Sequence, residues 1–370
     1  MTALTQQQGD LRDVVGEVMA ARSGEAEVRR QMAGDAGYDP DLWAELAGMG
    51  LLGLIIPEEY GGSGAGATEL SVVAEQMGRA LLCAPYLSTA VLTPYLLAAL
   101  DDAAESRAVL PRIASGELIA TVAFAEAGST RPPAEPATVA SHDAGGWRLT
   151  GEKTYVLDAA IADLVYVAAQ SGSGTAVFAV ERVAPGLTVT PLETLDQTRR
   201  QGRLTLADTP ARLIGAADGG ADALAVALDR AAVALVAEQA GGALHATQMA
   251  VDYARTRHQF GRAIGSFQAV KHMCVDMLLE AQSALSAARH VAAAFDAAEP
   301  DRLADLALAQ SYCSDAFVFV AATTIQAHGG IGFTWEHPAH LYLRRARTNA
   351  QIFGSPAWHR ERYIRLQEER

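Results

Sequence analysis

Cysteine and charged residues are scarce in this chain of 370 residues. Only three cysteines occur, Cys83, Cys274 and Cys313, and charged residues make up 19% of the sequence. Three widely spaced cysteines form neither a disulfide framework nor a zinc site, so we expect reduced, buried thiols in a cytoplasmic protein without a metal centre. Acidic residues are in excess and give a formal net charge of −14. This charge argues against non-specific nucleic-acid binding, because phosphate attachment needs a basic face.

Targeting and membrane-spanning signals are also missing. Residues 1–15 lack a basic patch followed by an apolar core, so we expect no signal peptide. The apolar stretch around Phe317–Ile325 is shorter than the ~20 residues that a spanning helix needs, so we expect no membrane span. Half of the chain is hydrophobic, which predicts a globular protein of two or three domains.

The periodicity of the sequence changes twice and divides the chain into three parts. Residues 1–117 have a helical pattern that a turn at 57–62 interrupts, residues 118–217 hold short β-rich runs, and residues 218–370 return to long helices rich in Ala and Leu. The β-rich runs lie at 118–126, 146–157, 163–170, 174–181, 187–193 and 202–208, and the long helices at 221–257, 266–299, 301–328 and 338–347. The expected fold is α+β and multidomain, with a helical N-terminal domain, a β-barrel-like middle domain and a C-terminal four-helix bundle.

Two segments combine the chemical groups that a dinucleotide requires. YARTRHQFGRAIGSFQ, residues 253–268, places Arg257, Phe260 and Gln268 after a long helix, and QAHGGIGF, residues 326–333, turns a helix into a glycine loop. The guanidinium suits a pyrophosphate, and the ring and the amide suit adenine and ribose. The glycines let the main chain approach phosphate closely. The two segments therefore predict a dinucleotide site.

With these motifs in view, the chain resembles the acyl-CoA dehydrogenase family along essentially its whole length. LIIPEEYGGSG at 54–64 resembles the N-terminal signature of that family, FAEAG at 124–128 and GEKTYVLD at 151–158 resemble its flavin-facing segments, and the two segments above resemble its FAD segments. The resemblance implies non-covalent FAD, α,β-desaturation of an acyl-CoA thioester and electron transfer to an electron-transferring flavoprotein. It also implies dimers or tetramers in which a neighbouring subunit grips part of the FAD.

The resemblance implies roles for single residues as well. Those expected at FAD are Arg257, Phe260, Gln268, Gln326, Gly329, Gly330, Ser355, Glu126 and Tyr155. Arg257 would contact the pyrophosphate across a subunit interface, unless it forms a surface salt bridge. The glycine loop would accept pyrophosphate and ribose and could at the same time cap its helix. Tyr155 stands where the family usually has tryptophan against the isoalloxazine, or else faces the core. Asp229 resembles an aspartate near the CoA amides, or else is an acid at a helix N-terminus.

The chain departs from the family at the catalytic base. Gly354 aligns with the glycine that follows the family glutamate, so Phe353 stands where the carboxylate is expected, and Ala231 occupies the alternative base position on the first bundle helix. Neither side chain accepts a proton. Glu238, two turns beyond Ala231 on the same helical face, is the nearest substitute base, or else a carboxylate hydrogen-bonded within the bundle or to a partner subunit. A further departure is Leu157, which replaces a hydroxyl residue near the flavin ring.

Three functions therefore stay open. The chain is an active FAD-dependent acyl-CoA dehydrogenase with an unfamiliar base, or a partner-dependent subunit of an α2β2 heterotetramer in which a paralogue supplies the carboxylate. Pairs of the second kind occur in this family in bacterial degradation of steroid side chains. The third function is another flavin chemistry, such as oxidation or oxygenation, which no sequence feature supports.

Overall fold

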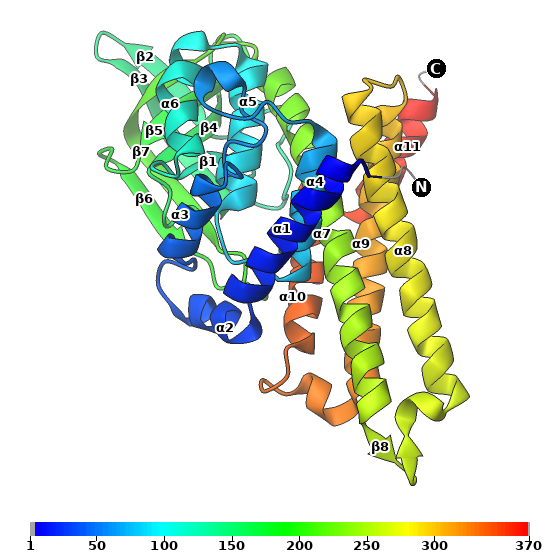
Figure 1. The fold of residues 1–370 in the computed structure, drawn as a ribbon. Helices are drawn as coiled ribbons and strands as arrows, with labels where there is room; N and C mark the ends of the chain where they lie inside the picture. The colour runs from blue at the N-terminus through cyan, green and yellow to red at the C-terminus, as the bar shows by residue number, and fades with distance from the viewer. Residues whose placement is uncertain (1–3, 369–370) are drawn as a thin grey trace. The chain divides into compact units, whose positions relative to one another are not determined.

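Two compact units make up residues 4–368, the part of the chain that this computed structural model describes (Figure 1). The helical unit comprises residues 4–32, 67–82 and 232–368, and the mixed unit comprises residues 33–66 and 83–231. Helix α7 (Gly220–Thr256) begins in the mixed unit and continues in the helical unit.

The helical unit is built around α9. Its other helices are α1 (Gln6–Arg22), α2 (Glu25–Ala33), α4 (Ala67–Arg79), α7, α8 (Gln268–Asp296), α10 (Ala339–Asn349) and α11 (Pro356–Glu368), and α9 itself spans Arg302–His328. α9 packs against α8, α10 and α11, and Figure 1 shows α7, α8 and α9 running alongside one another. Small buried residues such as Ala281, Ala284 and Ala288 on α8 allow close approach, because the distance between packed helices depends on the side chains at the contact.

Two glycines allow α4 and α7 to pack backbone against backbone. A Cβ atom at Gly78 of α4 would overlap the main chain of Glu238, and one at Gly241 of α7 would overlap the main chain of Glu75. Only glycine permits such an approach, since it has no side chain. This contact between α4 and α7 fixes the position of Glu238 relative to α4.

Helix α9 and the turn after it are long and apolar enough to cross a membrane, judged by length and composition alone. Core helices of globular proteins have the same length and composition, and α9 is such a core helix. Phe317 is 1% exposed and lies against Gly242 of α7, and the Thr324 hydroxyl donates to the Ala246 carbonyl at 3.0 Å. The apolar segment is thus longer than the stretch singled out in the sequence, and it packs as the central helix of the unit.

The mixed unit contains a small closed barrel. Its strands are β1 (Ala120–Ala123), β2 (Val139–Asp143), β3 (Gly146–Leu157), β4 (Leu164–Gln170), β5 (Thr175–Glu181), β6 (Leu187–Pro191) and β7 (Gln201–Ile214). The order is β1-β4-β2-β3-β7-β5, with β6 on β7, and an additional pairing between β4 and β5 closes the sheet. Phe178, Val167 and Leu204 lie among the fully buried core residues. Besides the barrel, the mixed unit contains helices α3 (Pro40–Gly48), η2 (Tyr86–Leu92), α5 (Thr93–Leu100) and α6 (Ala103–Ala114).

The predicted fold is confirmed in its architecture, with helical N- and C-terminal parts and a central small barrel. One strand escaped prediction. β2 pairs with β3 in a hairpin, but of its five residues only Ala140 is buried. A strand that exposes nearly every side chain lacks the alternation that marks strands in a sequence.

Two helical details also differ from the expectation. α11 was missed because its sequence is polar and only His359 is buried on it. Its start is nevertheless marked by Ser355 followed by Pro356, since serine at the N-cap and proline at the first helical position are common. The segment after Pro85 begins as a π-helix, η2, before it continues as α5.

All three cysteines are free, and two of them are buried as expected. Burial raises the pKa of Cys313 to about 12, so this thiol stays protonated. Cys274 is only partly buried, since it lies on α8 before Met277, the first buried residue of that helix. The expectation of three buried thiols is wrong at this position.

Candidate functional site

The first predicted segment forms an exposed hairpin between α7 and α8. Strands β8 (His258–Gln259) and β9 (Arg262–Ala263) are joined by Phe260 and Gly261, which both have positive φ angles, 54° and 79°. This is the geometry of a tight two-residue hairpin turn. For phenylalanine such a φ costs about 1–2 kcal/mol. The turn holds the Phe260 ring 92% exposed, in edge contact with Phe267 at 6.1 Å between centroids.

Arg257 and Gln268 stand at the two ends of this hairpin segment, and both are exposed. No hydrogen bond or ion pair of the Arg257 guanidinium is found within residues 4–368, so a surface salt bridge inside the chain does not account for it. An exposed ring and an unpaired guanidinium on one short segment leave both groups available to a ligand or to a neighbouring subunit.

The second predicted segment is an accessible glycine loop at the end of α9. Gly329 has a φ of 64°, its N–H donates to the Gln326 carbonyl, and the chain continues as the 3-10 turn η4 (Gly329–Phe333). A Cβ atom at Gly329 or at Gly330 would meet nothing within 4 Å, whereas one at Gly332 would meet His328. Gly332 thus serves packing, while the main chain at Gly329 and Gly330 is open. The loop both ends the helix and presents its backbone.

A ring contact brings the two segments together. His328, the last residue of α9, lies with its ring 4.3 Å from that of Tyr253 near the end of α7 and 4.2 Å from that of His337. Its Nδ1 is 2.7 Å from the Thr324 carbonyl oxygen, which fixes the ring. Sequence spacing could not reveal this link, because a histidine beside a glycine loop has no signature of its own.

Ser355 caps α11. Its hydroxyl accepts a hydrogen bond from the Trp358 N–H at 3.3 Å, and its carbonyl accepts one from the His359 N–H. The hydroxyl keeps its own proton available for a further acceptor.

The two family positions for the base are buried and apolar. Ala231 is 0% exposed and Phe353 is 5% exposed. Phe353 has a φ of 65° and is followed by Gly354 with a φ of 129°. A phenylalanine in the left-handed region is strained, and such residues persist only where their surroundings hold them. This loop therefore keeps an unusual backbone although it carries no carboxylate.

Glu238 lies in a buried polar cluster of the helical unit. Its Oε1 accepts hydrogen bonds from Arg345 Nη1 at 2.9 Å and from Asn349 Nδ2 at 3.0 Å. Arg345 is 2% exposed and also donates to the Leu82 carbonyl. The carboxylate thus joins α7 to α10. Its partner Asn349 is the last residue of α10 and lies four residues before Phe353. Of the two roles that the sequence left open, this geometry favours the hydrogen-bonded carboxylate.

Glu126 is held just as firmly in the mixed unit. Its carboxylate accepts from Lys153 Nζ at 2.7 Å, from the Thr138 N–H and hydroxyl, both at 2.9 Å, and from the Ala137 N–H at 2.8 Å. Burial opposes its ionisation, but the bonds from Lys153 and from the main chain outweigh burial and lower the pKa of Glu126 to about 2. The carboxylate therefore ties the segment before β2 to β3.

The ionisation of Glu126 should make the stability of the chain depend on pH. Because its folded-state pKa is depressed, its contribution is present above the ordinary value of 4.5 and is lost as the pH falls toward about 2. We expect Glu126→Gln to lower the urea midpoint at pH 7, and the difference from wild type to shrink below pH 4.5. A difference that stays constant across this range would contradict the ion pair. Glu152→Gln, next to Lys153 on β3, is the control, since its partner Arg203 is 48% exposed.

For both Tyr155 and Asp229, the structure excludes one of the two roles that the sequence left open. Tyr155 lies at a bulge of β3 with a φ of 54°, and its ring is 43% exposed, so it does not belong to the barrel core. Asp229 lies well inside α7, which begins at Gly220, and is half-buried. The helix dipole acts within the first turn, so the reading of Asp229 as an N-terminal acid is wrong.

Models of three acyl-CoA dehydrogenase domains match the chain in sequence order. The N-terminal domain matches residues 5–117, the middle domain residues 121–209 and the C-terminal domain residues 218–365. Acyl-CoA dehydrogenase IpdE2 of Mycobacterium tuberculosis is 36% identical over 360 residues, which cover 97% of this chain and 96% of that protein. FadE34 of the same organism is 33% identical over 97% of this chain and 48% of its own length.

Solved structures agree with these matches. One chain of the ChsE4-ChsE5 complex from Mycobacterium tuberculosis superposes with a TM-score of 0.89 at 31% identity, over 100% of both chains. A chain of the Tcur3481-Tcur3483 steroid ACAD superposes with a TM-score of 0.87 at 31% identity, over 98% of both chains. Butyryl-CoA dehydrogenase from Megasphaera elsdenii, at 22% identity, supports the fold alone with a TM-score of 0.90. This chain therefore belongs to the acyl-CoA dehydrogenase family of oxidoreductases.

Proposed function

We propose that this chain is the FAD-gripping subunit of a heteromeric acyl-CoA dehydrogenase whose catalytic carboxylate comes from the partner subunit. The observation that carries the proposal is the pair of apolar residues, Phe353 and Ala231, buried at the two positions where the family places its base. Proton abstraction needs a group that can accept a proton. Glu238, the remaining candidate, already receives two donors, from Arg345 and Asn349.

The residues of the helical unit fit the adenosine diphosphate part of FAD. Arg257 offers an exposed guanidinium for charge-assisted bonds to the pyrophosphate, and Phe260 offers a ring face that is 92% exposed. A Cβ atom at Gly329 or Gly330 would meet nothing within 4 Å, so a phosphate can approach the main chain of this loop closely. When bound, FAD supplies the hydride acceptor for α,β-desaturation. Gln268, Gln326 and Ser355 complete the proposed contacts.

Residues of the mixed unit have different proposed roles. The exposed ring of Tyr155 is proposed to contact the isoalloxazine, and Glu126 is a positioning residue, since both of its carboxylate oxygens bond to the chain itself. Asp229 is proposed to bind the amides of CoA. We further propose that an acyl-CoA thioester is the substrate, that an electron-transferring flavoprotein takes the electrons, and that the protein is cytoplasmic, where its three free thiols would stay reduced.

An apolar face of α8 supports assembly with a partner. Val275, Leu278 and Leu279 are 59%, 48% and 63% exposed and share one side of the helix, because residues three and four apart are neighbours. The opposite side, with Met277 and Ala281, is buried in the helical unit. Exposed apolar clusters of this kind mark interaction surfaces. The heteromeric ChsE4-ChsE5 relative makes a base-bearing paralogue the partner that we propose for this face.

The experiment that tests the proposal compares the chain alone with the chain coexpressed with a base-bearing paralogue. We expect the chain alone to leave its flavin oxidised when it is mixed with a panel of acyl-CoA and steroid side-chain thioesters. The coexpressed complex should bleach with at least one of them. Bleaching by the chain alone at the rate of the complex would overturn the proposal, and oxygen consumption without bleaching would point to oxygenase chemistry.

Placing a charge on the apolar face should disrupt the complex. We expect Leu279→Glu to shift the mass of the assembly to that of separate subunits in light scattering, because a buried carboxylate without a partner is costly. Val14→Glu, which places the same charge on an apolar residue of α1 that is 50% exposed, is the control and should leave the mass unchanged. An intact complex with Leu279→Glu would show that this face does not bind the partner.

A further inference from the structure

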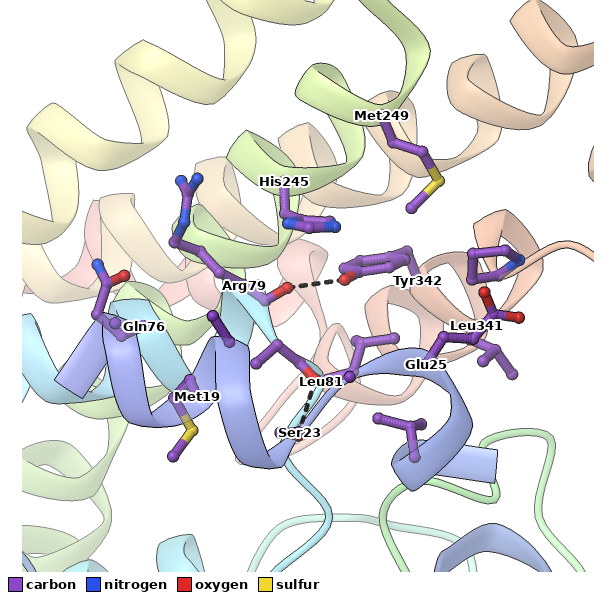
Figure 2. Close-up of a pocket in the computed structure, with 16 residues that line it drawn as sticks. Met19, Ser23, Glu25, Gln76, Arg79, Leu81, His245, Met249, Leu341 and Tyr342 are labelled. Carbon is purple, nitrogen blue, oxygen red and sulfur yellow. Dashed lines mark hydrogen bonds between the residues drawn. The ribbon is translucent and has the colours of Figure 1, made fainter. Parts of the chain in front are cut away.

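A cavity in the helical unit is separate from every residue assigned above. It has a volume of about 490 Å³ and lies between α1, α2, α4, α7 and α10 (Figure 2). Cavities of this size hold small organic molecules, which typically bind among apolar side chains with a few polar groups that fix their orientation. Met19, Val28, Leu81, Met249 and Leu341 give this cavity its apolar walls.

Most polar groups of the lining are already engaged. The Tyr342 hydroxyl donates to the Arg79 carbonyl at 2.7 Å, and the Ser23 hydroxyl donates to the Ala80 carbonyl at 3.1 Å. Glu25 pairs with Arg29 at 2.8 Å, so its negative charge is balanced. These groups have little capacity left for a ligand.

Two polar groups of the lining differ from the rest. Across residues 4–368, neither the Arg79 guanidinium nor the ring nitrogens of His245 have a hydrogen-bond or ion-pair partner. Figure 2 shows the Arg79 side chain extending from α4 toward α7, which carries His245. The His245 ring stacks on Tyr342 with 5.2 Å between centroids and 12° between planes, so its orientation is fixed. An unpaired cation in a half-buried site is costly unless something compensates it.

The lining of the cavity therefore carries one positive charge without a partner, that of the Arg79 guanidinium. Burial, together with the nearby Arg79 charge, lowers the pKa of His245 to about 4, so its ring is neutral at pH 7. A neutral imidazole offers one N–H donor and one acceptor. The guanidinium supplies two parallel donors, the geometry that matches a carboxylate.

From this combination we infer a second binding site, in which an amphipathic monocarboxylate places its carboxylate on Arg79 and His245 and its apolar body among Met19, Leu81 and Leu341. The site is independent of the proposed flavin chemistry. Arg79 and His245 are neither FAD residues nor base positions, so loss of this site should leave flavin occupancy unchanged.

Titration calorimetry with sodium octanoate and with 1-octanol on the purified protein tests the inference. We expect octanoate to bind with at least tenfold higher affinity than octanol, because only the carboxylate engages the guanidinium. Arg79→Gln should weaken octanoate binding at least tenfold, which corresponds to about 1.4 kcal/mol, and should leave octanol binding unchanged. Arg107→Gln, an exposed arginine of α6, is the control and should behave as wild type.

Further variants keep the test decisive if Arg79→Gln does not fold. His245→Phe keeps a ring to stack on Tyr342 and should weaken octanoate alone. Ala20→Leu, which narrows the cavity from α1, should weaken both ligands. Equal binding of octanoate and octanol, octanoate binding that these variants do not change, or no saturable binding of octanoate to the wild type would overturn the inference.

Discussion

Replacing Arg257 by alanine should strip most of the FAD from the assembled protein. The guanidinium is exposed and has no partner in the described chain, so its charge is available to the pyrophosphate. A hydrogen bond to a charged group contributes about 1.5–3 kcal/mol, which predicts a roughly 10- to 150-fold rise in the Kd for FAD. The ratio of flavin to protein absorbance after gel filtration measures the effect, and light scattering shows whether the assembly persists.

Arg255→Ala is the matched control. Arg255 lies two residues earlier on α7, is 74% exposed, and has only a distant partner, Asp252, at 3.9 Å. Its loss removes the same charge from the same helix end. Equal flavin content in the two variants would show that Arg257 has no special role at the pyrophosphate.

The sequence was most informative where local chemistry decides the structure. The glycine pattern of residues 326–333 correctly predicts both a helix end and an open backbone, because only glycine adopts these conformations without strain. The hairpin at Phe260 and Gly261 was not predicted, although it too is formed by a short local segment. Residues that act through a short segment of chain can be found from that segment.

Long-range partners could not be found in this way. Glu238 lies 107 residues before Arg345, and no spacing rule joins them. The cavity beside His245 is lined by residues that lie as far apart in the sequence as Gly16 and Tyr342. Glu126 and Lys153 were visible as members of two motifs, but their ion pair joins residues that are 27 positions apart. Burial and pairing over such distances are properties of the folded chain.

The buried pair of Glu238 and Arg345 should have the largest effect on stability in the helical unit. Glu238→Leu leaves the Arg345 guanidinium, which is 2% exposed, without its carboxylate. Removing one member of a buried ion pair typically costs about 3–5 kcal/mol. We therefore expect a clear fall in the urea midpoint at unchanged slope, measured on the chain by circular dichroism.

The double variant Glu238→Leu with Arg345→Leu separates an anchoring role from a catalytic one. An apolar pair of similar volume replaces a buried ion pair at little cost, so the double variant should recover most of the lost stability, short of the hydrogen bond to Asn349. If Glu238 only joins α7 to α10, the recovered complex should also bleach with its thioester at close to the wild-type rate. A stable double variant without turnover would make Glu238 the base and would remove the need for a carboxylate from the partner. A double variant as unstable as the single one would show that the two charges do not compensate each other.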